Sequence, residues 1–289
     1  MNGPPAGSVD RGDPHDGRPT AARMYNHALG GMDNFTADRE AVAKICAVLP
    51  GFPAAAWANR SFHQRAALWM ARQGISQFID IGCGIPARET THEAVRRILP
   101  AARVAYVDHD PEVISVVKAL TPADDSTAVT LADLRDPAGL LTILHLDGLI
   151  ELAEPAGLLV TAVLQFTGQA SDPGQCLARL VAALAPGSYV AVSHMTGDHL
   201  SPRVAAACIG AYQGAAGQLT LRTRAEVETF FAGLDLVPPY QGARPEVTGA
   251  GVWCAEDATM ADDESSRLWW AGVGHKPAAS RPERPGCHA

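Results

Sequence analysis

The sequence predicts a doubly wound α/β sheet that follows a helical extension. Short, nearly continuous apolar runs alternate with helical patterns, and this alternation is typical of such a sheet. Strands without polar alternation are expected to be covered on both faces, as in a parallel sheet. The predicted strands span residues 77–81, 104–108, 127–131, 157–164 and 189–193.

The helices between these strands are predicted from their capping residues. Asp110 and Asp172 each precede a proline, and an aspartate N-cap followed by proline is a favourable helix start. Asp136 also precedes a proline and fits the cap of the helix after the third strand. Thr223 and Glu226 form a capping-box motif ahead of another helix. These capping residues predict the helices that alternate with the strands.

Further elements are predicted at both ends of the sheet. Helical patterns at residues 36–49 and 57–73 precede the first strand. Residues 235–237 and 268–274 are strand candidates that are expected to pair antiparallel at one sheet edge. The expected organisation is a disordered tail over residues 1–20, a helical lid over 21–74, the sheet domain over 75–276 and a second disordered tail over 277–289.

Composition and charge exclude several classes of function. The 289 residues carry 23 basic and 31 acidic side chains, so we expect neither a nucleic-acid partner nor binding to an anionic membrane. Six cysteines form no C-x-x-C pair, which argues against a zinc site or a disulfide scaffold. No apolar run approaches the roughly 20 residues that span a bilayer, and residues 1–20 lack the apolar part of a signal peptide. A cytoplasmic protein without a metal site is expected.

The clearest local signal is Asp-Ile-Gly-Cys-Gly at residues 80–84, where a buried strand ends in an acid and two glycines. Glycines at the carboxyl end of a strand permit a tight turn and a close approach of a ligand to the backbone. Asp80, Gly82 and Gly84 are therefore expected to contact a cofactor. With Ala87, the spacing also satisfies a loose dinucleotide fingerprint. A plain tight turn is the alternative.

Asp108 ends the next strand and is expected to accept both hydroxyls of a ribose, as in NAD or S-adenosylmethionine. Two details favour S-adenosylmethionine. Asp80 precedes the glycines, where a carboxylate suits an ammonium group better than a pyrophosphate. Pro86 delays the next helix, whose N-terminus would otherwise bind phosphate. The alternative for Asp108 is a solvated acid at a strand end.

The adenine is expected to lie beside the third strand. Asp133 follows that strand and is expected to bind the exocyclic amine, while the backbone N–H of Leu134 meets a ring nitrogen. A helix cap is the alternative for Asp133, but Asp136 fits that role better. His109, directly after Asp108, is expected to pack on the adenine.

These motifs together resemble a known family. Residues 80–84, 106–111 (Tyr-Val-Asp-His-Asp-Pro) and 132–137 (Ala-Asp-Leu-Arg-Asp-Pro) resemble the successive cofactor motifs of class I S-adenosylmethionine-dependent methyltransferases. More narrowly, the chain is similar to the actinobacterial S-adenosyl methyltransferase family, formerly called a domain of unknown function. The similarity covers residues 18–276 and includes Arg-Met-Tyr-Asn-His-Ala-Leu-Gly-Gly at 23–31. It implies a Rossmann-like sheet of about seven strands with a reversed last strand, and S-adenosylmethionine as cofactor.

The resemblance extends to the segment before the sheet and to the ends of later strands. Tyr25 and Asn34 are expected to reach over the cofactor, with a purely structural lid as the alternative. Gln165 follows the fourth strand, where the family commonly has a histidine, and is expected to face the cofactor. An amide takes no proton at neutral pH, so Gln165 is a poor catalytic base. No base is assigned, and His194 after the fifth strand is the candidate.

The sequence therefore predicts a methyltransferase that acts on a small-molecule acceptor by in-line transfer. Positioning of donor and acceptor supplies much of the rate in such a reaction, which fits the absence of a catalytic triad motif. The acceptor pocket is expected to be built from loops at residues 196–217 and 240–263. One alternative is an S-adenosylmethionine-binding sensor or partner subunit without transferase activity. Another, which rests on the loose glycine fingerprint alone, is an NAD-dependent oxidoreductase.

Overall fold

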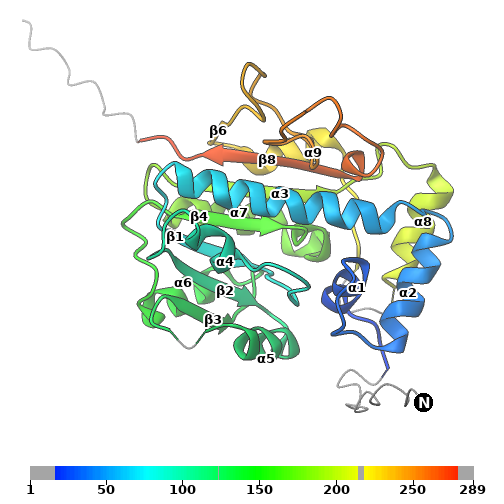
Figure 1. Ribbon diagram of the computed structural model, residues 1–289, viewed down its shortest axis with the longest axis horizontal. Coiled ribbons are helices and arrows are strands. Elements are labelled where there is room, and N and C mark those ends of the chain that lie inside the picture. Colours follow the sequence, from blue (N-terminus) through cyan, green and yellow to red (C-terminus); the bar gives the residue numbers. More distant parts are fainter. Residues whose placement is uncertain (1–16, 123, 214–217, 279–289) are drawn as a thin grey trace, which may run out of the picture.

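The computed structural model describes residues 17–122, 124–213 and 218–278, and the strands in these ranges form one eight-stranded sheet (Figure 1). The strands are β1 (Gln77–Ile81), β2 (Arg103–Asp108), β3 (Thr127–Leu131), β4 (Gly157–Thr161), β5 (Tyr189–Met195), β6 (Asp235–Leu236), β7 (Thr248–Gly249) and β8 (Trp269–His275). Their order is β3-β2-β1-β4-β5-β8-β6, and β7 pairs with β8. β1 to β5 are parallel, whereas β8 runs antiparallel to its neighbours. The predicted doubly wound sheet with a reversed last strand is confirmed.

Helices cover both faces of the sheet, and a separate group lies beyond the carboxyl ends of its parallel strands (Figure 1). The helices are α1 (Ala21–Ala28), α2 (Thr36–Cys46), α3 (Phe52–Arg72), α4 (Thr91–Arg96), α5 (Pro111–Leu120), α6 (Pro137–Asp147), α7 (Pro173–Ala183), α8 (Pro202–Ala211) and α9 (Arg224–Glu228). One face of the sheet packs against α6, α7 and α9, and the other against α3, α4 and α5. The predicted helical extension before the sheet consists of α1, α2 and α3.

Successive side chains of each parallel strand pack into two separate apolar clusters. In β1, Phe78 joins the cluster beneath α3, whereas Ile79 and Ile81 join the cluster beneath α6 and α7. None of these three side chains is more than 2% exposed. Burial on both faces explains why the strand sequences show no alternation of polar and apolar residues.

The predicted helix caps are present. The side chains of Asp110, Asp136 and Asp172 each accept a hydrogen bond from a backbone N–H two or three residues further on, at 2.9–3.1 Å. Thr223 and Glu226 cap α9 reciprocally, each side chain accepting from the other's backbone N–H. The sequence signals therefore locate the starts of α5, α6, α7 and α9 correctly.

Two predicted segments differ from the structure. β4 ends at Thr161 rather than at residue 164, because Ala162 has a φ of 59° that turns the chain out of the sheet. The segment 196–217, expected as a loop, contains α8. Ser201 caps α8 by accepting a hydrogen bond from the Val204 N–H, and a proline follows it. This cap-and-proline signal is the same as at Asp110, so the helix was predictable.

The predicted tails lie mainly outside the described residues, which begin at residue 17 and end at residue 278. Within the described part, Thr20 is 3% exposed and its hydroxyl accepts a hydrogen bond from the Arg23 N–H at the start of α1. Thr20, which the prediction places in the tail, therefore belongs to the capped start of α1.

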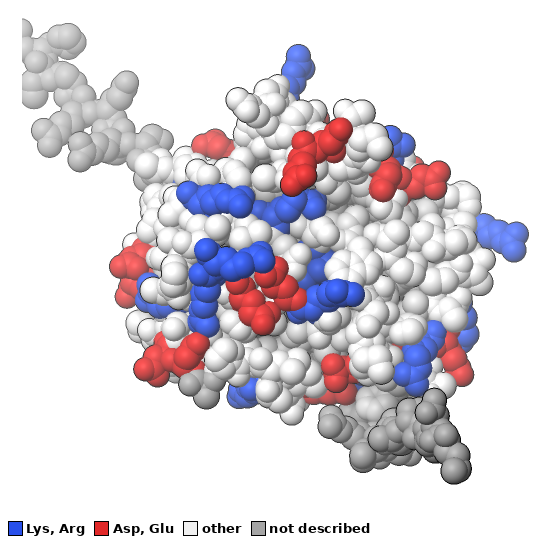
Figure 2. Space-filling view, viewed as in Figure 1, with Lys and Arg blue, Asp and Glu red and all other residues white. Residues whose placement is uncertain are grey.

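The surface carries both signs of charge. On the face shown in Figure 2, acidic and basic side chains of the described residues are interspersed rather than gathered by sign. The whole sequence has a net charge of −8. Among the described helices, none has the length and apolar character needed to cross a membrane.

Candidate functional site

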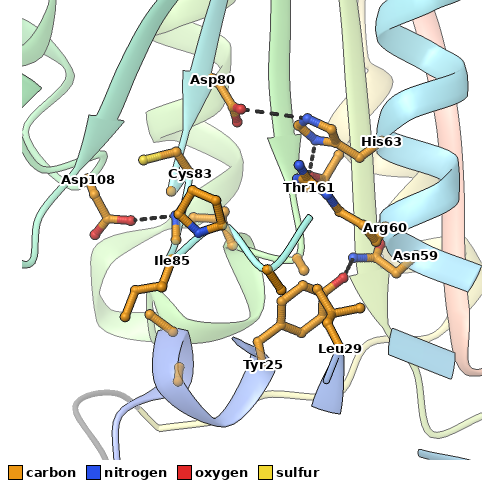
Figure 3. A pocket seen from close by; sticks show the side chains of 18 of the residues that line it. Tyr25, Leu29, Asn59, Arg60, His63, Asp80, Cys83, Ile85, Asp108 and Thr161 are labelled. Atoms are coloured by element: carbon orange, nitrogen blue, oxygen red, sulfur yellow. Dashed lines mark hydrogen bonds and ion pairs between the residues drawn. The ribbon is translucent and has the colours of Figure 1, made fainter. Parts of the chain in front are cut away.

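A cavity opens at the carboxyl ends of β1, β2 and β4, where β1 lies between the other two strands. Ligands of open α/β sheets bind at such a switch in strand order. The turn after β1 and helices α1 and α3 form its walls (Figure 3). The residues predicted from sequence that line it are Tyr25, Asp80, Gly82, Gly84, Asp108, His109 and Gln165.

The turn after β1 requires glycine. Gly82 and Gly84 have φ values of +64° and +63°, which L-residues with a side chain rarely adopt. The Gly82 N–H donates to the Val107 carbonyl at 2.7 Å, which ties the turn to β2. A Cβ atom on Gly82 would lie 2.4 Å from the side chain of Val163. Both the backbone conformation and the close approach of the segment after β4 therefore exclude larger residues.

Replacing Gly82 by alanine is expected to destabilise the protein more than the same change at Gly148. Gly148 has a similar φ of +68°, but a Cβ atom there meets nothing within 4 Å. The positive φ alone costs roughly 1–2 kcal/mol at either position, and the contact with Val163 adds to this only at Gly82. Chemical denaturation of the two variants measures the difference. Equal losses would show that the contact with Val163 is relieved without cost.

Asp108 joins the glycine turn to the start of α5. Its Oδ2 accepts a hydrogen bond from the Gly84 N–H at 3.1 Å, and its Oδ1 accepts from the Asp110 N–H at 3.0 Å. The side chain is buried but lines the cavity. Because a carboxylate has about four acceptor sites, Asp108 can still accept from ligand hydroxyls beside these two bonds and the contact with His109 Nδ1 at 3.3 Å. The adjacent His109 also lines the cavity, and its hydrogen bond to Asp108 raises the His109 pKa.

Asp80 ends a buried hydrogen-bonded chain. The Thr91 hydroxyl donates to Asp80 Oδ2 at 2.6 Å, so the Thr91 oxygen is left to accept from His63 Nε2 at 2.8 Å. His63 Nδ1 then accepts from the Thr161 hydroxyl, also at 2.8 Å. Burial lowers the pKa of His63 well below its usual value, which keeps the ring neutral. Burial also raises the pKa of Asp80 to about 6, although the Thr91 hydrogen bond and the charge of Arg60 oppose this.

The segment before α3 contributes Tyr25 to the cavity but not Asn34. The Tyr25 hydroxyl donates to the Ala56 carbonyl at 3.0 Å and accepts from Asn59 Nδ2 at 2.7 Å. Burial raises the pKa of Tyr25 to about 12, so the phenol remains protonated. Asn34 does not line the cavity; its amide donates to Asn26 Oδ1 at 2.9 Å and supports the turn after α1.

Of the predicted residues Gln165, Asp133 and Leu134, only the first lines the cavity. Gln165 lines the cavity, and its Oε1 accepts from the Met195 N–H at 3.2 Å. Asp133 lies outside the lining and forms an ion pair with Arg135 at 2.6 Å. Leu134 also lies outside it and packs in the cluster beneath α6 and α7. The structure thus gathers the ammonium and ribose candidates and the adenine candidate His109, but it does not bring Asp133 or Leu134 to the cavity.

His194 also lies away from the cavity. It is fully buried, with Nδ1 2.8 Å from the Met195 carbonyl and Nε2 2.6 Å from the Arg222 guanidinium. Since the guanidinium can only donate, Nε2 accepts and Nδ1 carries the proton. Burial lowers the pKa of His194 to about 3. This arrangement does not present a base to a ligand in the cavity.

Sequence reasoning missed the contribution of α3. Asn59, Arg60 and His63 line the cavity from the helix that precedes β1. Asn59 and His63 are four residues apart and share one helix face with the buried Phe62 and Ala66 nearby. Polar residues within an otherwise apolar buried face were the available signal, because buried polar groups need partners.

Comparisons with known proteins gave matches over most of the chain. A family model described as "S-adenosyl methyltransferase" matches residues 11–277. The crystal structure of a "putative methyltransferase" from Thermobifida fusca YX is 33% identical, with a TM-score of 0.84, and the match covers 94% of this chain and 100% of that one. A DUF574 family protein from Streptomyces avermitilis MA-4680 is 34% identical, with a TM-score of 0.81, over 90% of this chain and 98% of that one.

More distant comparisons concern the fold alone. The plantazolicin methyltransferase BpumL, solved in complex with a triazolic desmethylPZN analog and SAH, is 12% identical and has a TM-score of 0.50. The match covers 89% of this chain and 96% of that one. The comparison with curated proteins gave no match.

Proposed function

The chain belongs to the S-adenosyl methyltransferase family, whose cofactor is S-adenosylmethionine, and we propose that it methylates a small-molecule acceptor in the cavity beside β1. The charge of the cavity carries the proposal. Its described lining includes the carboxylates Asp80, Asp108 and Asp110 and one guanidinium, Arg60. S-Adenosylmethionine has a sulfonium, an ammonium and a carboxylate, a net charge of +1, which complements this lining. The two negative phosphates of NAD do not.

The cavity residues divide between the two ends of the cofactor. Asp108 and the glycine turn would hold the ribose, and Asp80 would face the ammonium group. When bound, S-adenosylmethionine supplies an electrophilic methyl group on sulfur. Asn59 donates a hydrogen bond to the Tyr25 hydroxyl, which joins α3 to α1 in the cavity wall. Rate enhancement then comes mainly from holding the reacting groups in line.

The affinity for S-adenosylmethionine is expected to fall about tenfold from pH 7 to pH 5. Because burial raises the pKa of Asp80 to about 6, this carboxyl is neutral below pH 6 and ionised above it. An ammonium group binds the ionised form. The groups that face Asp80 are Arg60 and His63 from α3, Thr91 from α4, and Asp108 from β2.

Titration calorimetry between pH 5 and pH 7.5 measures this dependence, and Asp80→Asn is its control. The variant is expected to bind more weakly at pH 7 and to lose the step near pH 6. If part of the pH dependence of affinity remained in the variant, we would assign it to His109, because its hydrogen bond to Asp108 raises the His109 pKa. An unchanged profile in Asp80→Asn would contradict the role of Asp80.

The acceptor end of the cavity is aromatic. Phe52, Phe166, Tyr212 and Trp269 line it, with the Phe166 and Tyr212 rings 5.3 Å apart. Trp269 begins β8, which lies four strand spacings, about 19 Å, from β2 and the ribose candidate Asp108. Aromatic walls favour an uncharged acceptor with an apolar or planar body. Tyr212 comes from the predicted acceptor segment 196–217, whereas no described residue of 240–263 lines this cavity.

The formation of S-adenosylhomocysteine tests methyl transfer. The protein is incubated with S-adenosylmethionine and two acceptor sets of similar size, one of uncharged phenols and aromatic amines and one of carboxylates and phosphates. Turnover is expected with members of the uncharged set. Turnover confined to the anionic set would contradict the assigned acceptor class.

A cofactor-binding protein without transferase activity is the second candidate. The observation that favours it is that both ring nitrogens of His63 are bonded to threonine hydroxyls, so this cavity histidine is not free to take an acceptor proton. Tight binding of S-adenosylmethionine with no turnover across both acceptor sets would support this candidate over the first.

A further inference from the structure

Arg60 is the one lysine or arginine among the described residues that line the cavity. We propose that its guanidinium binds the α-carboxylate at the methionine end of the cofactor, so that the protein selects ligands that retain this carboxylate. The inference rests on the proposed function and adds a specificity-determining residue that lies outside the glycine turn and the strand ends.

The guanidinium of Arg60 forms a hydrogen bond at one edge, and its other N–H groups can donate to a ligand. One Nη2 N–H donates to the Glu89 carbonyl at 2.6 Å, in the segment that leads into α4. A guanidinium has five N–H donors in one plane, so this single bond sets its orientation and leaves a fork for a carboxylate. No carboxylate within the described ranges forms an ion pair with Arg60.

Other arginines near this end of the molecule are already engaged. Arg23, fully buried, pairs with Asp38 and Glu112 at 2.8 Å each. Arg88 is exposed and lies over the Trp57 ring, 5.2 Å from its centroid, and it does not line the cavity. Among these three arginines, Arg60 alone combines contact with the cavity and an unmatched positive charge.

The charge of Arg60 also affects the pKa values of the groups expected at the methionine end. Burial is the main cause of the lowered pKa of His63, and the charge of Arg60 lowers it further. The same charge opposes the burial that raises the pKa of Asp80. Figure 3 shows Arg60 on the same side of the cavity as His63 and Thr161, away from Asp108. A carboxylate and a guanidinium that line the same cavity match the ammonium and carboxylate of an α-amino acid.

The arrangement predicts which adenosine ligands the protein accepts. S-Adenosylmethionine and S-adenosylhomocysteine carry the α-carboxylate. Decarboxylated S-adenosylmethionine, the aminopropyl donor, lacks it, and 5′-methylthioadenosine lacks the whole amino-acid end. The wild-type protein is therefore expected to bind decarboxylated S-adenosylmethionine about tenfold to a hundredfold more weakly than S-adenosylmethionine.

Titration calorimetry with S-adenosylhomocysteine and 5′-methylthioadenosine separates the role of Arg60 from general shaping of the cavity. Arg60→Gln is expected to weaken S-adenosylhomocysteine binding about tenfold to a hundredfold and to change 5′-methylthioadenosine binding less than twofold. Arg60→Lys, which keeps the charge but not the fork, is expected to fall between wild type and Arg60→Gln. Arg88→Gln is the matched control and is expected to bind both ligands like the wild type.

Equal weakening of both ligands in Arg60→Gln would overturn the proposal, as would no change in either. Equal wild-type affinity for S-adenosylmethionine and its decarboxylated form would also overturn it, and this comparison needs no variant. In each of these cases the proposed function stands, because wild-type binding of S-adenosylmethionine persists. Failure of the wild-type protein to bind either thioether ligand would instead overturn the proposed function and this inference with it.

Discussion

Asp108→Ala is expected to weaken S-adenosylmethionine binding by about two orders of magnitude or more. Two charge-assisted hydrogen bonds to the ribose hydroxyls would be lost, each worth roughly 1.5–3 kcal/mol. A loss of 1.4 kcal/mol corresponds to about a tenfold change in affinity. Titration calorimetry measures the effect. An affinity within about threefold of the wild type would reduce Asp108 to a structural acid.

The same substitution is expected to destabilise the fold. The backbone N–H groups of Gly84 and Asp110 both donate to Asp108, and alanine would leave them without this acceptor. Unsatisfied buried donors of this kind cost roughly 1–3 kcal/mol each. Chemical denaturation must therefore accompany the titration, and Asp108→Asn, which keeps the size of the side chain, serves as a milder variant.

Asp136→Ala provides the matched control for Asp108. Asp136 caps α6 by accepting from the Gly139 N–H at 3.0 Å, and it does not line the cavity. Loss of the cap is expected to lower the free energy of unfolding by about 1 kcal/mol and to leave cofactor affinity unchanged. If Asp136→Ala weakened binding as much as Asp108→Ala, the measured affinity would reflect the loss of fold stability rather than the loss of a contact with the cofactor.

Arg23→Met is expected to lower the free energy of unfolding by about 3–5 kcal/mol. Arg23 and Asp38 are both fully buried and 2.8 Å apart, so removal of the guanidinium leaves a buried carboxylate without its cation. The substitution also removes the 2.8 Å link from α1 to Glu112 at the start of α5. Chemical denaturation measures the loss.

Arg97→Met is the control for Arg23, because Arg97 pairs with Glu89 at the surface with 58% of its side chain exposed. Exposed pairs of this kind contribute less than about 1 kcal/mol. Similar losses in the two variants would contradict a special role for the buried pair. A fall in cofactor affinity only in Arg23→Met would indicate that α1 must dock on α5 to complete the cavity wall.

The sequence predicts the parallel part of the fold well because its signals are local. Burial on both faces produces uninterrupted apolar strands, and side-chain caps mark helix starts within three residues. The end of β4 was misplaced because the turn at Ala162 is left-handed, which the apolar composition of residues 157–164 does not signal. β7 has only two residues and is defined by its pairing with β8, so no local pattern predicts it.

The site was predictable where it lies at strand ends and less so where it depends on other elements. Asp80, Gly82 and Asp108 lie at the carboxyl ends of parallel strands, which meet at one edge of the sheet. Arg60 and His63 come from α3, which packs on one face of the sheet, and only the tertiary structure shows which of its side chains reach the cavity. His194 lies near the end of β5 as well, but its partners Met195 and Arg222 hold it in the core.

The central claim is that this cavity binds S-adenosylmethionine through the carboxylates at the ends of β1 and β2. Titration of the wild-type protein with S-adenosylmethionine and, separately, with NAD tests it most directly. We predict saturable one-to-one binding of S-adenosylmethionine, weakened about a hundredfold or more in Asp108→Ala, and no measurable binding of NAD. Tight binding of NAD without any response to S-adenosylmethionine would contradict the account.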